Sequence, residues 1–178
     1  MNPAHLLKAI AFAADKHRRQ RRKDADESPY INHPIAVATV LAVEVNVSDE
    51  ATLLAAVLHD TVEDTQTTFA ELEVHFGPDV AGLVRELTDD KSLAKGDRKR
   101  LQVERARDSS PQAKQIKIAD KISNVRDIKV SPPADWTLER RREYLTWSEQ
   151  VVAGCRGVNP KLDQAFDEAI REARKGLT

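Results

Sequence analysis

The chain has 178 residues, of which 40% are hydrophobic and 32% charged, and its formal net charge is −1. This composition suits a globular protein with a real core, and we expect a single domain over residues 1–178. The one cysteine, Cys155, excludes a disulfide framework and a cysteine-based zinc site, which fits a reducing, cytoplasmic setting. The longest apolar run has about six residues, far too few for a membrane span, and the N-terminus lacks a signal-peptide pattern.

The charge is distributed unevenly along the chain. Residues 1–23 contain seven basic and one acidic residue, residues 24–84 twelve acidic and no basic residues, and residues 85–178 contain 21 basic and 16 acidic residues. This pattern favours a site that binds a cation and an anion side by side, although surface helices can carry such asymmetry without a function. The basic N-terminal run also suggests nucleic acid, but the near-zero total charge and the absence of interleaved aromatic residues argue against that partner.

Helix signals begin at the N-terminus. Asn2-Pro3 is typical of a helix start, and the apolar spacing carries this helix to about His17. Residues 24–30 read as a loop. Asn32-His33-Pro34 then opens a second helix with proline at the first helical position, which puts His33 at its very N-terminus, and Ser48-Asp49 caps a third helix.

The remaining signals are also helical. Thr68 with Glu71 forms a capping-box pattern, and Gly77 stops that helix. Further helices are expected from Pro78, over 98–107 after a loop at 88–97, from Ser110-Pro111 to a break at 131–135, from Trp136 to Ala153, and from Asn159-Pro160. No convincing strand is found, so the sequence predicts an all-α bundle of roughly eight helices with short loops.

The stretch from Ala51 to Thr65 combines a core pattern with a cluster of charges. Its first half is apolar on every side, which is typical of a buried helix. Four ionisable groups follow on one helical face, where three carboxylates would repel each other and a divalent cation would relieve the repulsion. A solvated helix end is the plainer alternative, but such a face normally mixes signs, and residues 24–84 contain no Lys or Arg. The four groups are His59, Asp60, Glu63 and Asp64, with His59 and Glu63 at i,i+4.

A metal site needs ligands from several segments, and two more residues qualify. His33 precedes a helix, and Asp120 lies in the otherwise apolar run KIADKI. Taken alone, Asp120 could form an ordinary salt bridge to Lys117 or Lys121. Joined to His33 and the His-Asp pair of the central stretch, it becomes a fourth ligand.

The order H…HD…D resembles that of the HD metal-dependent phosphohydrolase superfamily. The HD pair alone is a weak signal, but it is strong together with NHP and KIADKISNVRD. The segments HRRQRRKD…PYINHPIAVA, AAVLHDTVEDT and KIADKISNVRDI resemble the hydrolase domain of RelA/SpoT alarmone enzymes. The chain length and the segments DDKSL…RKRLQVE and WTLERRREYLTW resemble the stand-alone form, the metazoan SpoT homologue and its bacterial small alarmone hydrolase relatives. That form leaves no room for a synthetase domain.

The resemblance implies hydrolysis of guanosine 3′-diphosphate 5′-di- or triphosphate, (p)ppGpp, to pyrophosphate and GDP or GTP. It also implies one Mn²⁺ ion; two imidazoles and two carboxylates suit a divalent metal, while their spacing does not choose among manganese, iron and zinc. By the same match Glu63 and Asp64 position and deprotonate the water or protonate the leaving ribose oxygen, with the division of roles open. The implied metal ligands are His33, His59, Asp60 and Asp120.

The resemblance extends to the residues that would hold the nucleotide. Arg22 and Lys23 match the family's Arg-Lys pair, where Arg22 would stack on guanine and Lys23 would meet phosphate; without the match, a solvated basic tail is the default interpretation. Asn124 matches an asparagine near the ribose. The groups expected at the 5′ phosphates are Lys95, Arg140 and Tyr144, with Arg141 and Arg142 as neighbouring rivals of Arg140.

Two departures leave fine substrate selectivity open: Arg19 stands where the long enzymes have glycine, and Ser123 where they have histidine. Removal of a ribose 2′ phosphate, as in NADPH, is the alternative activity, because the stand-alone family is linked to it. Phosphatases for 5′-nucleotides or deoxynucleoside triphosphates fit the motifs poorly, and no GYP motif of cyclic dinucleotide phosphodiesterases occurs. The intact set of acidic and imidazole groups argues against a catalytically dead nucleotide sensor. The sequence does not determine the oligomeric state.

Overall fold

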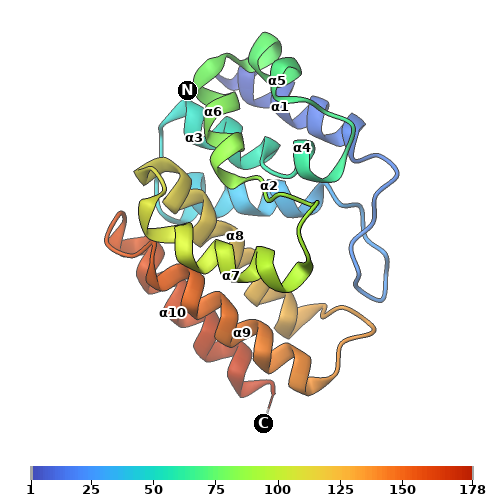
Figure 1. The fold of residues 1–178 in the computed structure, drawn as a ribbon, viewed down its shortest axis with the longest axis vertical. Coiled ribbons are helices and arrows are strands. Elements are labelled where there is room, and N and C mark those ends of the chain that lie inside the picture. Colours follow the sequence, from blue (N-terminus) through green and yellow to red (C-terminus); the bar gives the residue numbers. More distant parts are fainter. Residues whose placement is uncertain (1, 178) are drawn as a thin grey trace.

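The computed structural model describes residues 2–177, and the chain is all-α over this range (Figure 1). The only β-type pairing among these residues is an isolated antiparallel bridge between Arg21 and Pro29. The all-α prediction is therefore confirmed. The helices are α1 (Pro3–Lys16), α2 (Asn32–Thr39) with a π-helical extension (Val40–Glu44), α3 (Glu50–Leu58), α4 (Thr61–Asp64), α5 (Phe69–Phe76), α6 (Pro78–Leu87), α7 (Lys95–Arg105) with a 3-10 turn (Ala106–Asp108), α8 (Pro111–Val130), α9 (Leu138–Ala153) and α10 (Pro160–Lys175).

Five helix starts that depend on a capping side chain agree with the sequence prediction. In each of five helices a polar side chain accepts a hydrogen bond from a backbone N–H of the first turn, and this satisfies a donor that has no partner inside the helix. These caps are Asn2, Asp49, Thr68, Ser110 and Asn159.

Two helix starts differ from the prediction. Helix α7 begins at Lys95 instead of residue 98, and Ala94 before it offers no side-chain cap that the sequence could reveal. Helix α9 begins at Leu138 instead of Trp136, because the Thr137 side chain accepts a hydrogen bond from the Arg140 N–H.

The expected continuous helix over the central stretch is interrupted after Leu58. The His59 side chain bonds the Ala56 carbonyl, 2.8 Å from Nδ1, and the Thr61 hydroxyl donates to the Leu58 carbonyl over 2.6 Å. Side chains that bond nearby carbonyls in this way compete with the helical ladder. The chain turns at His59 and Asp60 and resumes as the short helix α4, so the expected i,i+4 alignment of His59 with Glu63 along one helix is wrong.

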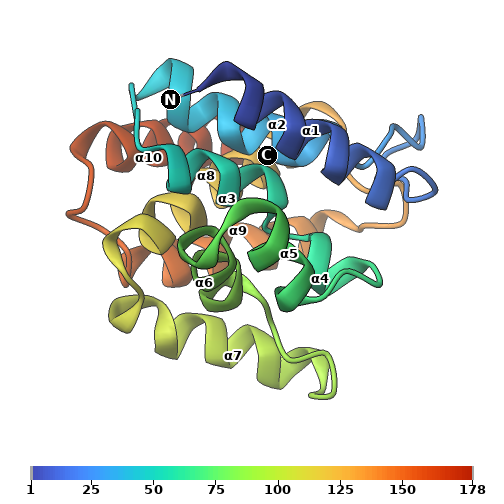
Figure 2. The same ribbon diagram turned by 90° about the horizontal axis from the view of Figure 1, so that it is seen from above.

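Helix α8 is the central element of the core. It packs against α2, α3, α6, α9 and α10, and Figure 2 shows these helices arranged around it. The residues of α3 from Thr52 to Leu58 are all buried, as the all-round apolar pattern predicts. The buried helix α3 and the central helix α8 therefore hold their side chains at the candidate site in fixed positions.

The loops at 17–31 and 131–137 project from the same side of the molecule (Figure 1). They are in contact, because the Ala134 N–H donates to the Lys23 carbonyl over 2.9 Å. This side of the molecule carries the candidate site. Within residues 2–177 no helix has both the length and the apolar character that crossing a bilayer requires.

The end of α9 packs closely against the turn after α7 at Gly154, and this contact can be tested by replacing Gly154 and, as a control, Gly82 with alanine. A Cβ on Gly154 would lie 2.8 Å from the Ala106 Cβ and 3.0 Å from the Arg107 backbone nitrogen. Gly154→Ala should therefore lower the free energy of unfolding in urea by about 1–3 kcal/mol. Gly82 lies inside α6 with nothing within 4 Å of an added Cβ, so Gly82→Ala should raise stability by about 0.5–1 kcal/mol. Equal losses in both variants would contradict the steric explanation.

Candidate active site

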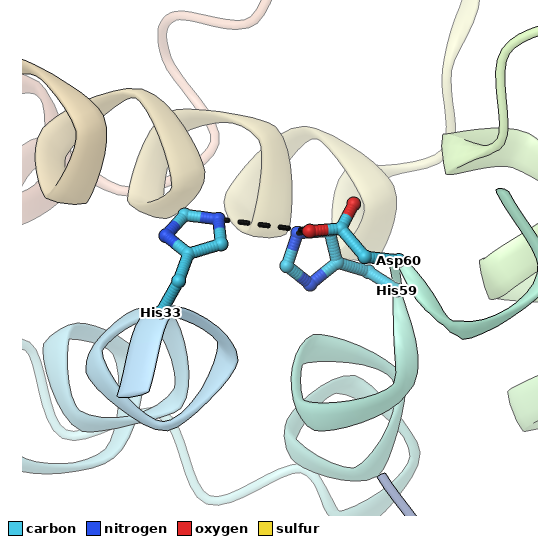
Figure 3. A group of neighbouring side chains, drawn as sticks. All are labelled: His33, His59 and Asp60. Carbon is cyan, nitrogen blue, oxygen red and sulfur yellow. Dashed lines mark ion pairs between the residues drawn. The ribbon is translucent and has the colours of Figure 1, made fainter. Parts of the chain in front are cut away.

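Four side chains from three segments converge at one buried point. His33 lies in the first turn of α2, His59 and Asp60 form the turn after α3, and Asp120 lies midway along α8. His33 Nε2 is 3.1 Å from Asp120 Oδ1 and 3.8 Å from Asp60 Oδ2. His59 Nε2 is 3.1 Å from Asp60 Oδ2 and 3.9 Å from Asp120 Oδ1. In Figure 3 the ring of His33 faces the ring of His59 and the Asp60 carboxylate.

Both imidazoles are held through Nδ1, which leaves Nε2 directed at the carboxylates. His59 Nδ1 lies 2.8 Å from the Ala56 carbonyl, and His33 Nδ1 lies 3.2 Å from the Ser123 hydroxyl. An imidazole whose Nδ1–H is bonded to such an acceptor presents the Nε2 lone pair, which is the usual arrangement for a metal ligand. Ligand atoms of His33, His59 and Asp60 lie within 4.8 Å of one another, so these residues fit a metal ion.

The electrostatics of the cluster also favour a cation. Burial alone would lower the pKa of His59, but the neighbouring Asp60 outweighs burial and raises it to about 9. Burial opposes ionisation of both aspartates, yet His59 holds the pKa of Asp60 well below its usual range, and Lys121 does the same for Asp120. The two carboxylates therefore stay ionised in a buried site, where positive charge must compensate them.

Glu63 and Asp64 lie on the short helix α4, directly after the His-Asp turn. Glu63 accepts a hydrogen bond from the Asp89 backbone N–H over 3.1 Å, and Asp64 accepts one from Gln20 over 2.9 Å and pairs with Lys91. Burial raises the pKa of Glu63, and the carboxylates around it add to this effect. A carboxyl group with a raised pKa next to a metal-type cluster is better suited to accepting and returning a proton than an ordinary carboxylate.

Arg22 is connected to the metal-type cluster through Asn124. Its guanidinium lies 2.6 Å from Asp127 and 3.2 Å from the Asn124 side-chain oxygen, and the Asn124 amide donates to Asp120 over 2.7 Å. The Arg22 side chain is only 19% exposed, so it is not part of a solvated tail. It also lies over the Tyr30 ring, 5.7 Å from the centroid.

Three adjoining cavities surround this chain of contacts. A cavity of about 190 Å³ is lined by the four converging side chains and by Glu63, among others. A cavity of about 410 Å³ is lined by Arg22, Lys23, Asn124 and Tyr144, among others. A cavity of about 560 Å³ is lined by Lys23, Lys95, Arg140 and Tyr144. The structure thus brings every residue expected from the sequence to one connected region.

Several residues at the site are absent from the sequence prediction. The Tyr30 hydroxyl donates to Asp60 over 2.6 Å, and Ser123 supports His33 as described above. Arg98 and Lys99 line the largest of the three cavities, and Arg98 lies 3.9 Å from Glu63. The basic run RKR predicts a charged helix, but periodicity alone does not say which side of it faces a cavity.

In this helical fold a histidine, a His-Asp pair and a distant aspartate meet at one point beside a basic cavity. This arrangement is that of a phosphohydrolase-type site of the HD class. Residues 9–146 match the HD domain family, and the chain belongs to this family. The resemblance to the HD superfamily that the motifs indicate is therefore confirmed.

The relatives include stand-alone and longer proteins. The chain is 53% identical to the guanosine-3′,5′-bis(diphosphate) 3′-pyrophosphohydrolase MESH1 of Drosophila melanogaster, over 95% of this chain and 94% of that protein. It is also 53% identical to MESH1 of Homo sapiens, over 98% and 97% of the two chains. The GTP pyrophosphokinase rsh of Brucella melitensis is 38% identical to this chain. The aligned region is 73% of this chain but only 18% of that longer protein.

Two solved structures share the fold. A metazoan ortholog of SpoT, described as hydrolysing ppGpp, superimposes with a TM-score of 0.93 and 52% identity, over 100% of this chain and 99% of that one. The protein lmo0812 from Listeria monocytogenes gives a TM-score of 0.67 with 28% identity, over 84% of this chain and 98% of that one.

Metal binding should depend on the protonation of His59. A metal ion held by His59 would need the Nε2 lone pair, and the pKa of His59 is about 9, so a proton would leave for each ion bound below that pH. The apparent dissociation constant for Mn²⁺ should fall by about tenfold per pH unit between about pH 7 and pH 9 and then level off. Calorimetry in buffers of different ionisation enthalpy measures the released proton. Binding that does not change with pH over this range would contradict a role for His59 as a ligand.

Proposed function

We propose that this chain hydrolyses (p)ppGpp at the 3′ position, giving pyrophosphate and GDP or GTP, with one Mn²⁺ ion as cofactor. The observation that carries the proposal is the joining of the His-His-Asp-Asp cluster to Arg22 through Asn124, beside cavities large enough for a nucleotide. The names of the MESH1 relatives, at 53% identity over nearly the whole chain, support the same substrate.

The proposed ligands of the ion are His33, His59, Asp60 and Asp120, and these residues fit a divalent metal by their chemistry. When bound, such an ion lowers the pKa of a coordinated water and withdraws charge from the phosphoryl group. Tyr30 and Ser123 support the ligands, because they hydrogen-bond Asp60 and His33. Such supporting contacts fix the orientation of metal ligands.

Glu63 and Asp64 are the proposed proton-transfer groups. Attack of water on the 3′ phosphorus breaks the bond to the ribose 3′ oxygen; the water gives up a proton, and the leaving oxygen takes one. The raised pKa of Glu63 suits such an exchange, while Asp64 is held between Gln20 and Lys91 and lines the cavity of about 410 Å³.

Cationic and polar side chains around the two larger cavities are the proposed nucleotide contacts. Arg22 is restrained by Asp127 and Asn124, so its planar guanidinium is already ordered for stacking against a base. Asn124 would lie near the ribose. The proposed phosphate contacts are Lys23, Lys95, Arg140 and Tyr144, which line the cavity of about 560 Å³.

Removal of a 2′ phosphate from NADPH is the second candidate function. It is favoured by the two adjoining cavities, which share Lys23, Trp136 and Tyr144 and could take the two halves of a dinucleotide. Trp136, Tyr144 and Trp147 form a continuous row with ring centroids 5.3 and 5.4 Å apart, which is a suitable surface for a second ring.

Product analysis separates the two activities. The purified protein with added Mn²⁺ should convert the guanosine tetraphosphate to GDP and pyrophosphate, without prior release of orthophosphate. Orthophosphate release from NADPH, with no pyrophosphate from ppGpp, would replace the first proposal by the second. No turnover of either substrate in the presence of Mn²⁺ would contradict both.

Glu63→Gln should keep metal and nucleotide binding but lower kcat. The amide has nearly the same shape, so the Asp89 N–H keeps an acceptor, whereas proton transfer is lost. General acid–base catalysis is typically worth roughly 10²–10⁴-fold, and kcat should fall within this range. Steady-state kinetics together with metal analysis measure the change. If Glu63→Gln keeps near-full kcat, Glu63 has only a supporting role.

Arg22→Ala should raise KM for ppGpp and leave kcat nearly unchanged. The stacked cation binds the ground state and the transition state alike, and its loss should cost about 1–2 kcal/mol of binding. Arg22→Lys should recover little, because an ammonium group does not stack as a planar guanidinium does. Arg19→Ala is the matched control, since Arg19 is exposed on the same segment and lines none of the three cavities. An unchanged KM in Arg22→Ala for every guanine nucleotide would contradict this role.

A further inference from the structure

The side chain of Gln20 connects a buried histidine to one of the proposed proton-transfer groups. Gln20 Nε2 lies 2.9 Å from Asp64 Oδ2, and Gln20 Oε1 lies 2.7 Å from His17 Nδ1. His17 is only 2% exposed and sits at the end of α1. Three side chains from two distant segments of the chain thus form one row that ends at Asp64.

The chemistry of the groups fixes the direction of these hydrogen bonds. The Asp64 carboxylate can only accept, so the Gln20 amide must turn its NH₂ group toward it and its oxygen toward His17. His17 must then donate from Nδ1. His17 Nε2 is buried and has no hydrogen-bond partner among the described residues, so Gln20 is the one side chain that the His17 ring bonds within this range.

His17 is itself held in place by the neighbouring tyrosine. Its ring lies 4.8 Å from the Tyr30 ring, centroid to centroid, and the Tyr30 hydroxyl donates to Asp60. The loop after α1 therefore reaches both a proposed metal ligand and a proposed proton-transfer group. Asp64 also pairs with Lys91, but this contact restrains the carboxylate less than the Gln20 contact does. The Lys91 side chain is 48% exposed, and solvent screens such ion pairs.

We propose that Gln20 is a positioning residue for Asp64 and that His17 holds Gln20 in the required orientation. This inference rests on the proposed function only in that Asp64 takes part in turnover. A hydrogen bond from a side chain that is itself held fixes the carboxylate rotamer, whereas the exposed lysine alone leaves it mobile. Small displacements of a proton-transfer group lower the rate without weakening substrate binding.

Kinetics on single and double variants test the catalytic part of the proposal. Gln20→Ala should lower kcat for ppGpp by about 10- to 100-fold, with KM within about twofold of the parent value. Asp64→Asn should lower kcat at least as far. The double variant should be no slower than Asp64→Asn alone, because Gln20 acts only through Asp64. Multiplying losses, or a change confined to KM, would overturn the proposal.

Thermal unfolding of the parent protein, Gln20→Ala, Asp64→Ala and their double variant tests the contact without any substrate. Alanine replaces Asp64 here because an asparagine would keep an acceptor for the Gln20 amide. The stability losses of Gln20→Ala and Asp64→Ala should be non-additive, since both remove the same hydrogen bond. If coupling in stability is found but ppGpp is not hydrolysed, the proposed function fails while the contact stands. If ppGpp is hydrolysed and the kinetic losses multiply, the positioning role fails while the proposed function stands.

The donor role of His17 can be tested by partial replacement. An asparagine places its side-chain NH₂ close to the position of the imidazole Nδ1–H, so His17→Asn should recover most of the kcat that His17→Ala loses. Arg18→Ala is the control on the same segment: its exposed guanidinium pairs with Asp15 and lines none of the three cavities, so the variant should keep full activity. Equal kcat in His17→Asn and His17→Ala would show that His17 acts through packing alone and would overturn its assigned part.

Discussion

The carboxylates of Asp60 and Asp120, which are 18% and 17% exposed, lie within 4 Å of the same pair of buried imidazole nitrogens, and the candidate site depends on this concentration of negative charge. Such a cluster is costly to bury without a compensating cation. The segments that carry it are packed together: α2 and α3 pack on each other, and both pack on α8, whose buried residues are mainly aliphatic. The well-packed aliphatic core thus provides the rigidity that holds the ligands at fixed distances.

Around this rigid centre, the groups proposed for proton transfer and nucleotide binding are positioned by loops. Gln20 and Arg22 belong to the loop after α1, and Asp89 and Lys91 belong to the loop after α6. Each loop contacts one of the two acidic side chains of α4 or both. Asn124 on α8 is the link between the two layers, because it contacts both Arg22 and Asp120. Binding residues on loops over a rigid scaffold are a common arrangement.

The sequence predicts most helices and the converging ligands, because caps and the H…HD…D order are local signals. It does not predict the break after Leu58, because the apolar periodicity continues past His59 and Asp60. The break is also slight, since both residues keep right-handed helical dihedrals. The sequence also misses Gln20, Tyr30 and Ser123 as supports for the site. Their partners lie 30 to 90 residues away in the chain, so only the packing of α1, α2 and α8 brings them together.

Folding brings the acidic segment 24–84 next to the basic flanks of the chain. The segment 24–84 has no cation of its own, and its acidic side chains find partners in the basic flanks: Lys91 pairs with Asp64, Arg98 approaches Glu63, and Arg126 bonds Glu44. Where no flanking cation reaches, at Asp60, two imidazoles meet the carboxylate. Other basic groups of the flanks line the two larger cavities: Arg21, Arg22, Lys23, Lys95, Lys99 and Arg140. Negative charge and positive charge therefore lie side by side at the site, although one of the central carboxylates, Asp120, comes from the net-basic flank.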